Sequence, residues 1–193
     1  MRPVKLLAIV LLLGIPAWVG AQAARTAASA PEVFSGTAEI KNATGAMSGT
    51  IEIRMSRYSL DFDRTNIETA LRLGGYPRFL PALRAAPEVG QLVLAGGTPF
   101  AIRYAREKVE GGSRTITLVT DKPVFFIGAG RTNAPPRAGF EVGVVQIQVD
   151  ASGRGKGTMA GAARVRPDGD GGVLLDDYAD EPIALTNIIR KPS

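Results

Sequence analysis

Apolar and polar residues alternate with a period of two along most of this chain. The clearest stretch covers residues 50–56, where Ile51, Ile53 and Met55 alternate with polar neighbours. This period is typical of a β-strand that buries one face and exposes the other to water. Similar stretches recur about every 10–15 residues and are mostly separated by turn-forming Gly, Asp, Ser and Pro residues. They predict strands near residues 34–40, 50–56, 89–95, 100–105, 115–119, 144–149, 158–165, 173–178 and 183–189, with a short apolar piece at 124–127.

Helical spacing replaces this alternation between residues 63 and 87. Thr65 followed by Glu68 has the form of a capping box, and apolar residues then recur at helical spacing up to the glycine pair at 74–75. Pro81 suits the first turn of a second helical piece, which another proline ends. The segment 63–87 is therefore predicted to hold two short helices inserted between strands.

The short connections between the predicted strands indicate an antiparallel arrangement. Parallel strands need a crossover after each strand, and only one helical stretch is present. Neighbours in sequence are then expected to be neighbours in space. We predict an all-β, β-rich fold with a short helical insertion: an antiparallel up-and-down barrel or curled sheet, lipocalin-like in general shape, with the helices capping one end. A β-sandwich is the alternative that the spacing leaves open.

The N-terminal segment has the features of a secretory signal peptide. Basic Arg2 and Lys5 precede an apolar run, and Ala21 and Ala23 supply the small residues of a cleavage site. The run is too short and wrongly flanked for a membrane-spanning helix. We therefore expect export to the periplasm or the medium, with no integral membrane segment after processing. The predicted organisation is a signal peptide over residues 1–23, a flexible lead-in over 24–32 and a single β-rich domain over 33–193.

The sequence of 193 residues contains neither Cys nor His, which narrows the chemistry that the protein can perform. It can form no disulfide, thiol nucleophile or histidine-based triad. Carboxylate chemistry, Ser–Lys chemistry, chemistry at an oxygen-ligated metal, or no chemistry remain. The Asp- and Gly-rich turn at 168–172 does not match an EF-hand loop, so we expect no metal and no cofactor. The formal net charge of +5 comes without a basic block, so nucleic acid is not an expected partner.

The densest polar cluster on a predicted strand lies at residues 103–107. Alternation places Tyr104 and Arg106 on one face, and an Arg106 directed into a barrel would bind an anion. Asp121 and Lys122 end the next strand, where they would lie at the rim of a ligand-binding mouth. These four residues are the predicted ligand-binding site; ion pairing at a strand end and a proline-fixed turn are the structural alternatives. The apolar lining expected inside the barrel is Phe100, Ile102, Ile116, Leu118, Val145 and Ile147.

A set of short motifs extends across most of the chain. LPALRAAPEVG at 80–90, RYARE at 103–107, SRTITLVTDKP at 113–123 and VQIQVDASGRGKGTM at 145–159 occur in this order, with RYS at 57–59 and a closing stretch at 177–190. Together they resemble a family of short exported bacterial proteins of unknown function. The resemblance implies export and a strand-rich domain, and it implies no catalytic activity.

Different classes of function are consistent with these features. We favour an exported protein that binds a small apolar or amphipathic ligand. The alternative is a hydrolase that acts on glycans with two carboxylates, for which Glu107, Asp121 and Asp177 are candidates. An envelope accessory with a structural role and no ligand is a further alternative. Binding is preferred to catalysis because a chain without His or Cys has few ways to build a base near neutral pH, and no catalytic residue is assigned.

Overall fold

The structure is a computed structural model that describes residues 31–42, 45–125, 137–179 and 182–192. The predicted signal peptide and nearly all of the lead-in lie outside these residues, as does the second half of the apolar piece at 124–127. In chain order the elements are β1 (Glu32–Asn42), β2 (Gly45–Met55), α1 (Asp61–Ala85), β3 (Gly90–Leu94), β4 (Phe100–Glu110), β5 (Ser113–Thr120), β6 (Val142–Val149), β7 (Arg154–Pro167), β8 (Val173–Tyr178) and β9 (Ile183–Lys191).

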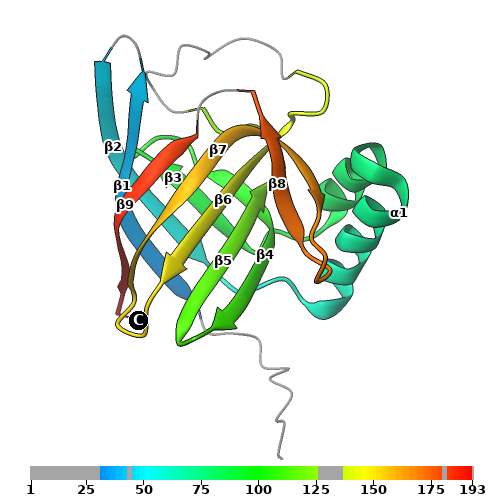
Figure 1. Cartoon of the computed structure of the whole chain (residues 1–193), viewed down its shortest axis with the longest axis horizontal. Coiled ribbons are helices and arrows are strands. Elements are labelled where there is room, and N and C mark those ends of the chain that lie inside the picture. Colours follow the sequence, from blue (N-terminus) through cyan, green and yellow to red (C-terminus); the bar gives the residue numbers. More distant parts are fainter. Residues whose placement is uncertain (1–30, 43–44, 126–136, 180–181, 193) are drawn as a thin grey trace, which may run out of the picture.

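Eight antiparallel strands close into a barrel (Figure 1). Around the wall they follow the order β6, β5, β4, β3, β2, β1, β9 and β7, and the pairing of β6 with β7 closes the circle. The predicted all-β, lipocalin-like antiparallel barrel with a helical insertion is thereby confirmed. A sandwich would leave two separate sheets, whereas here every wall strand pairs on both sides.

β8 lies outside the barrel wall because β7 is long enough to pair with two partners on one edge. Residues Arg154 to Met159 of β7 pair with β9, whereas Ala163 to Pro167 pair with β8. The chain therefore forms β8 before it returns to complete the wall with β9. The expected up-and-down order holds from β1 to β7 and is interrupted by β8, which forms an arm with the end of β7 (Figure 1).

Apolar side chains form two layers, one inside the barrel and one between its outer surface and α1. Adjacent residues of a strand face opposite sides, so Tyr104 belongs to the outer layer and Ala105 to the inner layer. The inner layer includes Phe34, Ile51, Ile53, Leu92, Ile102, Ile116, Leu118, Val145, Ile147 and Met159. The outer layer includes Ile67, Leu71, Phe79, Leu83, Tyr104, Val119, Val144, Ala160, Val165 and Val173.

The helical insertion consists of two helical pieces that meet at a kink, and the first piece ends at the glycine pair as predicted, whereas the second begins before Pro81. Gly75 interrupts α1 with a φ of 61° and a ψ of −163°, a backbone conformation that favours glycine. The helix begins before the predicted capping box, and Glu68 hydrogen-bonds to Tyr104 instead of capping the backbone. The expectation that the helices cap one end was wrong, since α1 packs against the side of the barrel (Figure 1). Among the described residues, no helix combines the length and apolar character needed to cross a membrane.

Charged side chains span one end of the barrel, where β1 begins and β9 ends. Arg114 donates from Nη1 and Nη2 to the two carboxylate oxygens of Glu32 at 3.0 and 2.8 Å, and from Nε to Glu107. Tyr58 Oη donates to Glu32 at 2.8 Å, and Arg190 Nη1 donates to it at 3.2 Å. Because β1 and β5 are not neighbours in the wall, the contact between Glu32 and Arg114 crosses the barrel interior. We call these five residues the barrel-end network.

Candidate ligand-binding clefts

The side chains expected to line an internal cavity pack against one another inside the barrel. Ile102, Ile116 and Ile147 are fully buried in the inner layer, together with Leu118 and Val145. The sixth predicted lining residue, a phenylalanine at position 100, is partly buried and packs against the same layer. The apolar surface of these residues is therefore buried mainly by contacts among themselves.

Tyr104 and Arg106 lie on the outer side of the barrel wall, between β4 and α1. Tyr104 Oη donates to Glu68 Oε1 at 2.8 Å, and Arg106 Nη1 lies 3.8 Å from the same oxygen. Burial, the hydrogen bond to Glu68 and its negative charge raise the pKa of Tyr104 above its ordinary value. Arg106 Nη2 also donates to the carbonyl oxygen of Asp170 at 3.2 Å. The two residues thus connect β4 to the helix and to the β7–β8 turn.

Asp121 and Lys122 lie at the end of β5, apart from these contacts. Asp121 Oδ2 accepts a hydrogen bond from Arg103 Nε at 3.1 Å, and Arg103 Nη1 donates to the carbonyl oxygen of Ala86 at 3.0 Å. The other carboxylate oxygen, Oδ1, is buried and has no hydrogen-bond partner in the described part of the chain. Lys122 is exposed. The four predicted residues therefore form two groups, and their role in ligand binding stays a prediction.

Each carboxylate considered for a hydrolase lies beside an arginine on a different part of the molecule. Asp121 pairs with Arg103 after β5. Glu107 on β4 belongs to the barrel-end network through Arg114. On the arm, the carboxylate at position 177 lies 3.3 Å from a guanidinium nitrogen of the arginine at position 164. None of these contacts joins two of the three acids, as the two-carboxylate mechanism would require.

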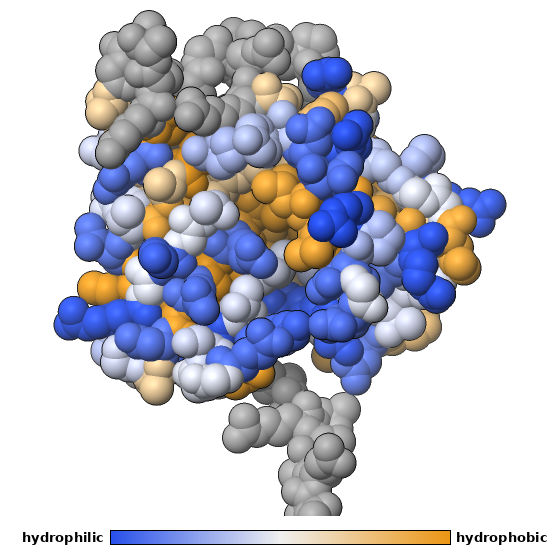
Figure 2. Space-filling view, in the orientation of Figure 1, coloured by the Kyte–Doolittle hydropathy of each residue, from blue (hydrophilic) through white to orange (hydrophobic). Residues whose placement is uncertain are grey.

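The arm formed by β7 and β8 leaves a cleft of about 270 Å³ against the outer faces of β5, β6 and β7. Figure 2 shows apolar surface gathered in the middle of this face, between polar side chains. We call this hollow the β8 cleft. Its apolar lining is Val144, Ala160, Val173, Leu174, Leu175 and Pro182, and its polar lining is Thr117, Gln146, Thr158 and Arg166.

Local contacts explain how the arm is held in place over the cleft. Val173 is buried in the outer layer and anchors the start of β8. Farther along, Arg164 Nε lies 2.9 Å from Asp176 Oδ2, and its Nη2 lies 3.3 Å from Asp177 Oδ2. The β8 residues between these two attachments, Leu174 and Leu175, remain partly exposed and line the cleft.

A second hollow of about 410 Å³ continues from the β8 cleft along the barrel surface. The two hollows share Gln146 and Thr158. The second is lined by polar residues, with Thr115, Gln148 and Lys156 completing its surface, and we call it the amide groove. Within the described residues the side-chain amides at 146 and 148 make no intramolecular hydrogen bond, so they are available to a ligand. The combined site has an apolar end and a hydrogen-bonding end.

Comparison with known proteins adds no relative to this description. No family model matches the chain, and no curated protein or solved structure shows a significant match. In the ranges that the structure describes, no group of three or more Asp and Glu side chains is arranged to hold a metal ion.

The residues of the β8 cleft were not identified from the sequence, although part of the signal was present. Leu174 and Leu175 are consecutive apolar residues, so a strand that contains them has an apolar side chain on each face. Such a strand needs cover on both sides or leaves apolar surface exposed. The polar alternation of Gln146 and Gln148 also marks an outward face of β6. These leucines and glutamines lie close together only because of the position of the arm, and the alternation of apolar and polar residues does not predict that position.

Proposed function

We propose that this protein is an exported binding protein for a small amphipathic molecule, which it holds in the β8 cleft and the amide groove. The observation that carries the proposal is the direct continuation of an apolar cleft into a polar groove through Gln146 and Thr158. Small-molecule sites are concave and mostly apolar, with a few polar groups that fix the orientation of the ligand. The amide groove, at about 410 Å³, lies within the range of about 300–1,000 Å³ that is typical of such sites, and the β8 cleft that continues it, at about 270 Å³, lies just below that range.

The lining residues determine the orientation of the ligand, with its apolar part in the β8 cleft and its polar end in the amide groove. The apolar part of the ligand lies against Val144, Ala160 and Leu175, because burial of apolar surface contributes about 25 cal/mol per Å². Its polar end accepts hydrogen bonds from Gln148 and is close to the ammonium group of Lys156. The preferred ligand therefore carries an acceptor-rich or anionic group at one end.

Support for export comes from the N-terminal sequence. Residues 1–23 combine a basic start, an apolar run and small residues at the expected cleavage site. A ligand of this protein is then expected among the small molecules of the cell envelope or the medium.

Blocking the junction of the two hollows tests the proposal. Thr158 is exposed and lines both, so Thr158→Trp fills the junction without entering either apolar layer. In calorimetric titration with 8-anilinonaphthalene-1-sulfonate, an anionic amphipathic probe, we expect one-to-one binding that this substitution weakens by about tenfold or more.

Thr98→Trp is the matched control, because Thr98 is exposed in the β3–β4 turn and lines neither hollow. It is expected to bind the probe like the wild type. Equal binding by the Thr158→Trp variant, or no binding by the wild type, would overturn the proposed site. If the probe binds as expected, native mass spectrometry of the protein recovered from its own cells identifies the mass of the natural ligand.

A further inference from the structure

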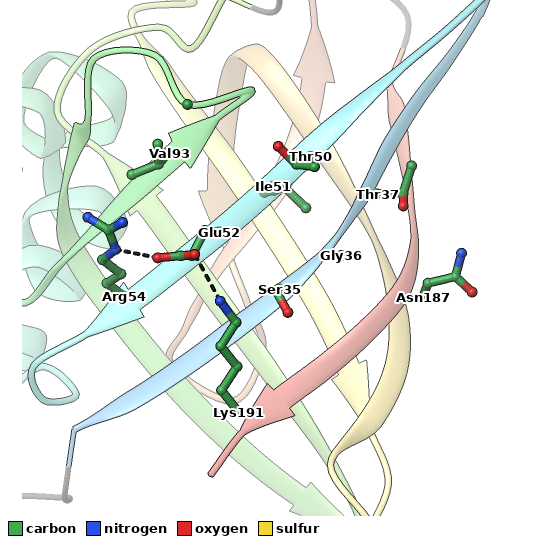
Figure 3. A pocket seen from close by; sticks show the side chains of 11 residues that line it. Ser35, Gly36, Thr37, Thr50, Ile51, Glu52, Arg54, Val93, Asn187 and Lys191 are labelled. Carbon is green, nitrogen blue, oxygen red and sulfur yellow. Dashed lines mark hydrogen bonds and ion pairs between the residues drawn. The ribbon is translucent and has the colours of Figure 1, made fainter. Parts of the chain in front are cut away.

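A groove of about 470 Å³ lies on a different part of the barrel surface, across β9, β1, β2 and β3 (Figure 3). It shares no lining residue with the β8 cleft or the amide groove. Its lining is dominated by hydroxyl, amide and charged side chains rather than apolar ones. We call it the β1–β2 groove, and the inference drawn from it does not depend on the proposed function.

An irregularity between β1 and β9 shapes this groove. Ser35 pairs with Ile189 and Thr37 pairs with Thr186, so two residues of β9 oppose the single residue Gly36. A Cβ atom at Gly36 would lie 2.5 Å from Ile188 Cδ1, which shows how closely β9 approaches at this point. One of these two residues of β9, Asn187, has a φ of 52° and lines the groove. The bulge thus adds an amide to a polar strand surface.

Three charged side chains form an ordered group in this groove. The Glu52 carboxylate accepts hydrogen bonds from Arg54 on the same strand and from Lys191 Nζ on β9 at 3.0 Å, across β1 (Figure 3). Hydrogen bonds from Arg54 and Lys191 hold the pKa of Glu52 below its ordinary value of 4.5. One acid and two bases leave a net positive charge. The guanidinium and ammonium groups also have more N–H donors than Glu52 uses.

Hydroxyl groups lie next to these charges without internal partners. Ser35, Thr37 and Thr50 line the groove and make no intramolecular side-chain hydrogen bond within the described ranges. Hydroxyl and amide groups can both donate and accept, which matches the hydroxyl groups of a sugar ring. Val93 adds an apolar contact of the kind that the C–H face of a sugar needs.

We propose that the β1–β2 groove binds an acidic saccharide of the uronic acid class. The sugar carboxylate lies at the free donors of Arg54 and Lys191, and the sugar hydroxyls bond to Ser35, Thr37 and Asn187. No covalent step is involved. The site gives the protein an attachment to an acidic glycan that is separate from the amphipathic ligand.

Calorimetric titration of the full chain with trigalacturonate and with maltotriose tests this site, since the two oligosaccharides have the same length and differ in charge. We expect trigalacturonate to bind and maltotriose to bind at least about tenfold more weakly. Arg54→Gln and Lys191→Gln are each expected to weaken trigalacturonate binding by about tenfold, because each removes donors that no other side chain replaces. Both side chains are about half exposed, so the variants are expected to fold.

Arg72→Gln provides the matched control, because it makes the same change in net charge at an exposed position on α1. It is expected to bind trigalacturonate like the wild type. The proposal is overturned if the wild type fails to bind trigalacturonate, if maltotriose binds equally well, or if the Arg72 variant is weakened as much as the two groove variants. Binding of 8-anilinonaphthalene-1-sulfonate measured on the same samples reports the β8 cleft separately.

Discussion

Glu32 is an acidic residue at the start of β1 whose charge is held by other members of the barrel-end network. Its side chain is 12% exposed. Burial raises its pKa, but hydrogen bonds from Arg114 and Tyr58 and the charge of Arg114 lower it by more. The pKa of Glu32 therefore lies below its ordinary value of 4.5. Ionised Glu32 thus stabilises the folded state above that value, and this contribution is lost as the pH falls through the lowered pKa.

The first prediction concerns the pH dependence of stability. Glu32→Gln is expected to lower the free energy of unfolding by about 2 kcal/mol at pH 7, because charge-assisted hydrogen bonds to Arg114 are lost. The difference is expected to shrink between pH 7 and pH 3, because the carboxyl group of the unfolded wild type is protonated near its ordinary pKa of 4.5, whereas the folded state keeps it ionised to lower pH. Urea denaturation of both proteins at several pH values measures this. A difference that stays constant from pH 7 to pH 3 would contradict the assigned role of the carboxylate.

The second prediction concerns the close approach of β9 to β1. Gly36→Ala places a Cβ within 2.8 Å of the Thr186 carbonyl oxygen, where backbone must shift, and is expected to cost about 1–3 kcal/mol of stability. Gly169→Ala is the control, since a Cβ there meets nothing within 4 Å. Thermal denaturation of both variants measures the difference. Equal melting temperatures would show that the bulge accommodates a side chain.

At the scale of elements, α1 is held by one face and leaves the other to solvent. Ile67, Leu71, Phe79 and Leu83 are buried against the barrel, whereas Leu73 is 70% exposed. Because the kink at Gly75 changes the direction of the chain, both halves of the helix reach the same outer layer. Packing against the strands, rather than a side-chain cap at its start, therefore stabilises this helix.

The third prediction compares two leucines of this helix. Leu71→Ala is expected to lower the free energy of unfolding by about 2–5 kcal/mol, because it removes buried apolar surface and leaves a cavity. Leu73→Ala is expected to change it by less than about 0.5 kcal/mol. Chemical denaturation measures both, and hydrogen exchange is expected to show faster exchange in α1 for the first variant alone. Similar losses for the two would contradict the observed orientation of the helix.

The positions of the strands were predictable because alternation is a local property of the sequence. Which strands pair with each other was not predictable from it. The pattern around Ile51, Ile53 and Met55 predicts β2 and its buried face. It does not predict that β7 extends beyond β9 and pairs with β8, since this depends on relative strand lengths. The glycine pair at 74–75 predicted the break between the two helical pieces, and the positive φ of Gly75 produces it as a kink. Thr65 and Glu68 do not form a cap because the helix already begins at Asp61 and includes both residues, and the Glu68 carboxylate accepts a hydrogen bond from Tyr104 instead.

At the scale of the whole molecule, the two apolar layers share one barrel wall. β4, β5, β6 and β7 contribute residues to both, so each of these strands is covered on two sides along part of its length. The candidate clefts lie where this double cover ends. The residue pattern alone could identify polar positions such as Arg106 and Asp121 as candidates for ligand binding. It could not show that these side chains form ion pairs with other residues of the protein, Arg106 with Glu68 on α1 and Asp121 with Arg103. The clefts instead depend on where β8 and the bulge near Asn187 lie in space.

The fourth prediction follows from the shared wall. The inner and outer layers are expected to unfold together, because loss of either one exposes apolar faces of the same strands. Far-ultraviolet and near-ultraviolet circular dichroism, recorded during urea denaturation, are therefore expected to give one coincident transition. Two separate midpoints would show that α1 and its layer unfold independently of the barrel.

The pairing of β1 with β9 also bears on circular permutation. Val33 lies opposite Lys191, so the first and last wall strands meet at the same end of the barrel. A short linker between these ends would span neighbouring strands, and new termini at the exposed β3–β4 turn would interrupt no ladder. A permuted chain is therefore expected to form the same barrel wall. The fold then does not depend on whether the chain is continuous between β9 and β1 or between β3 and β4.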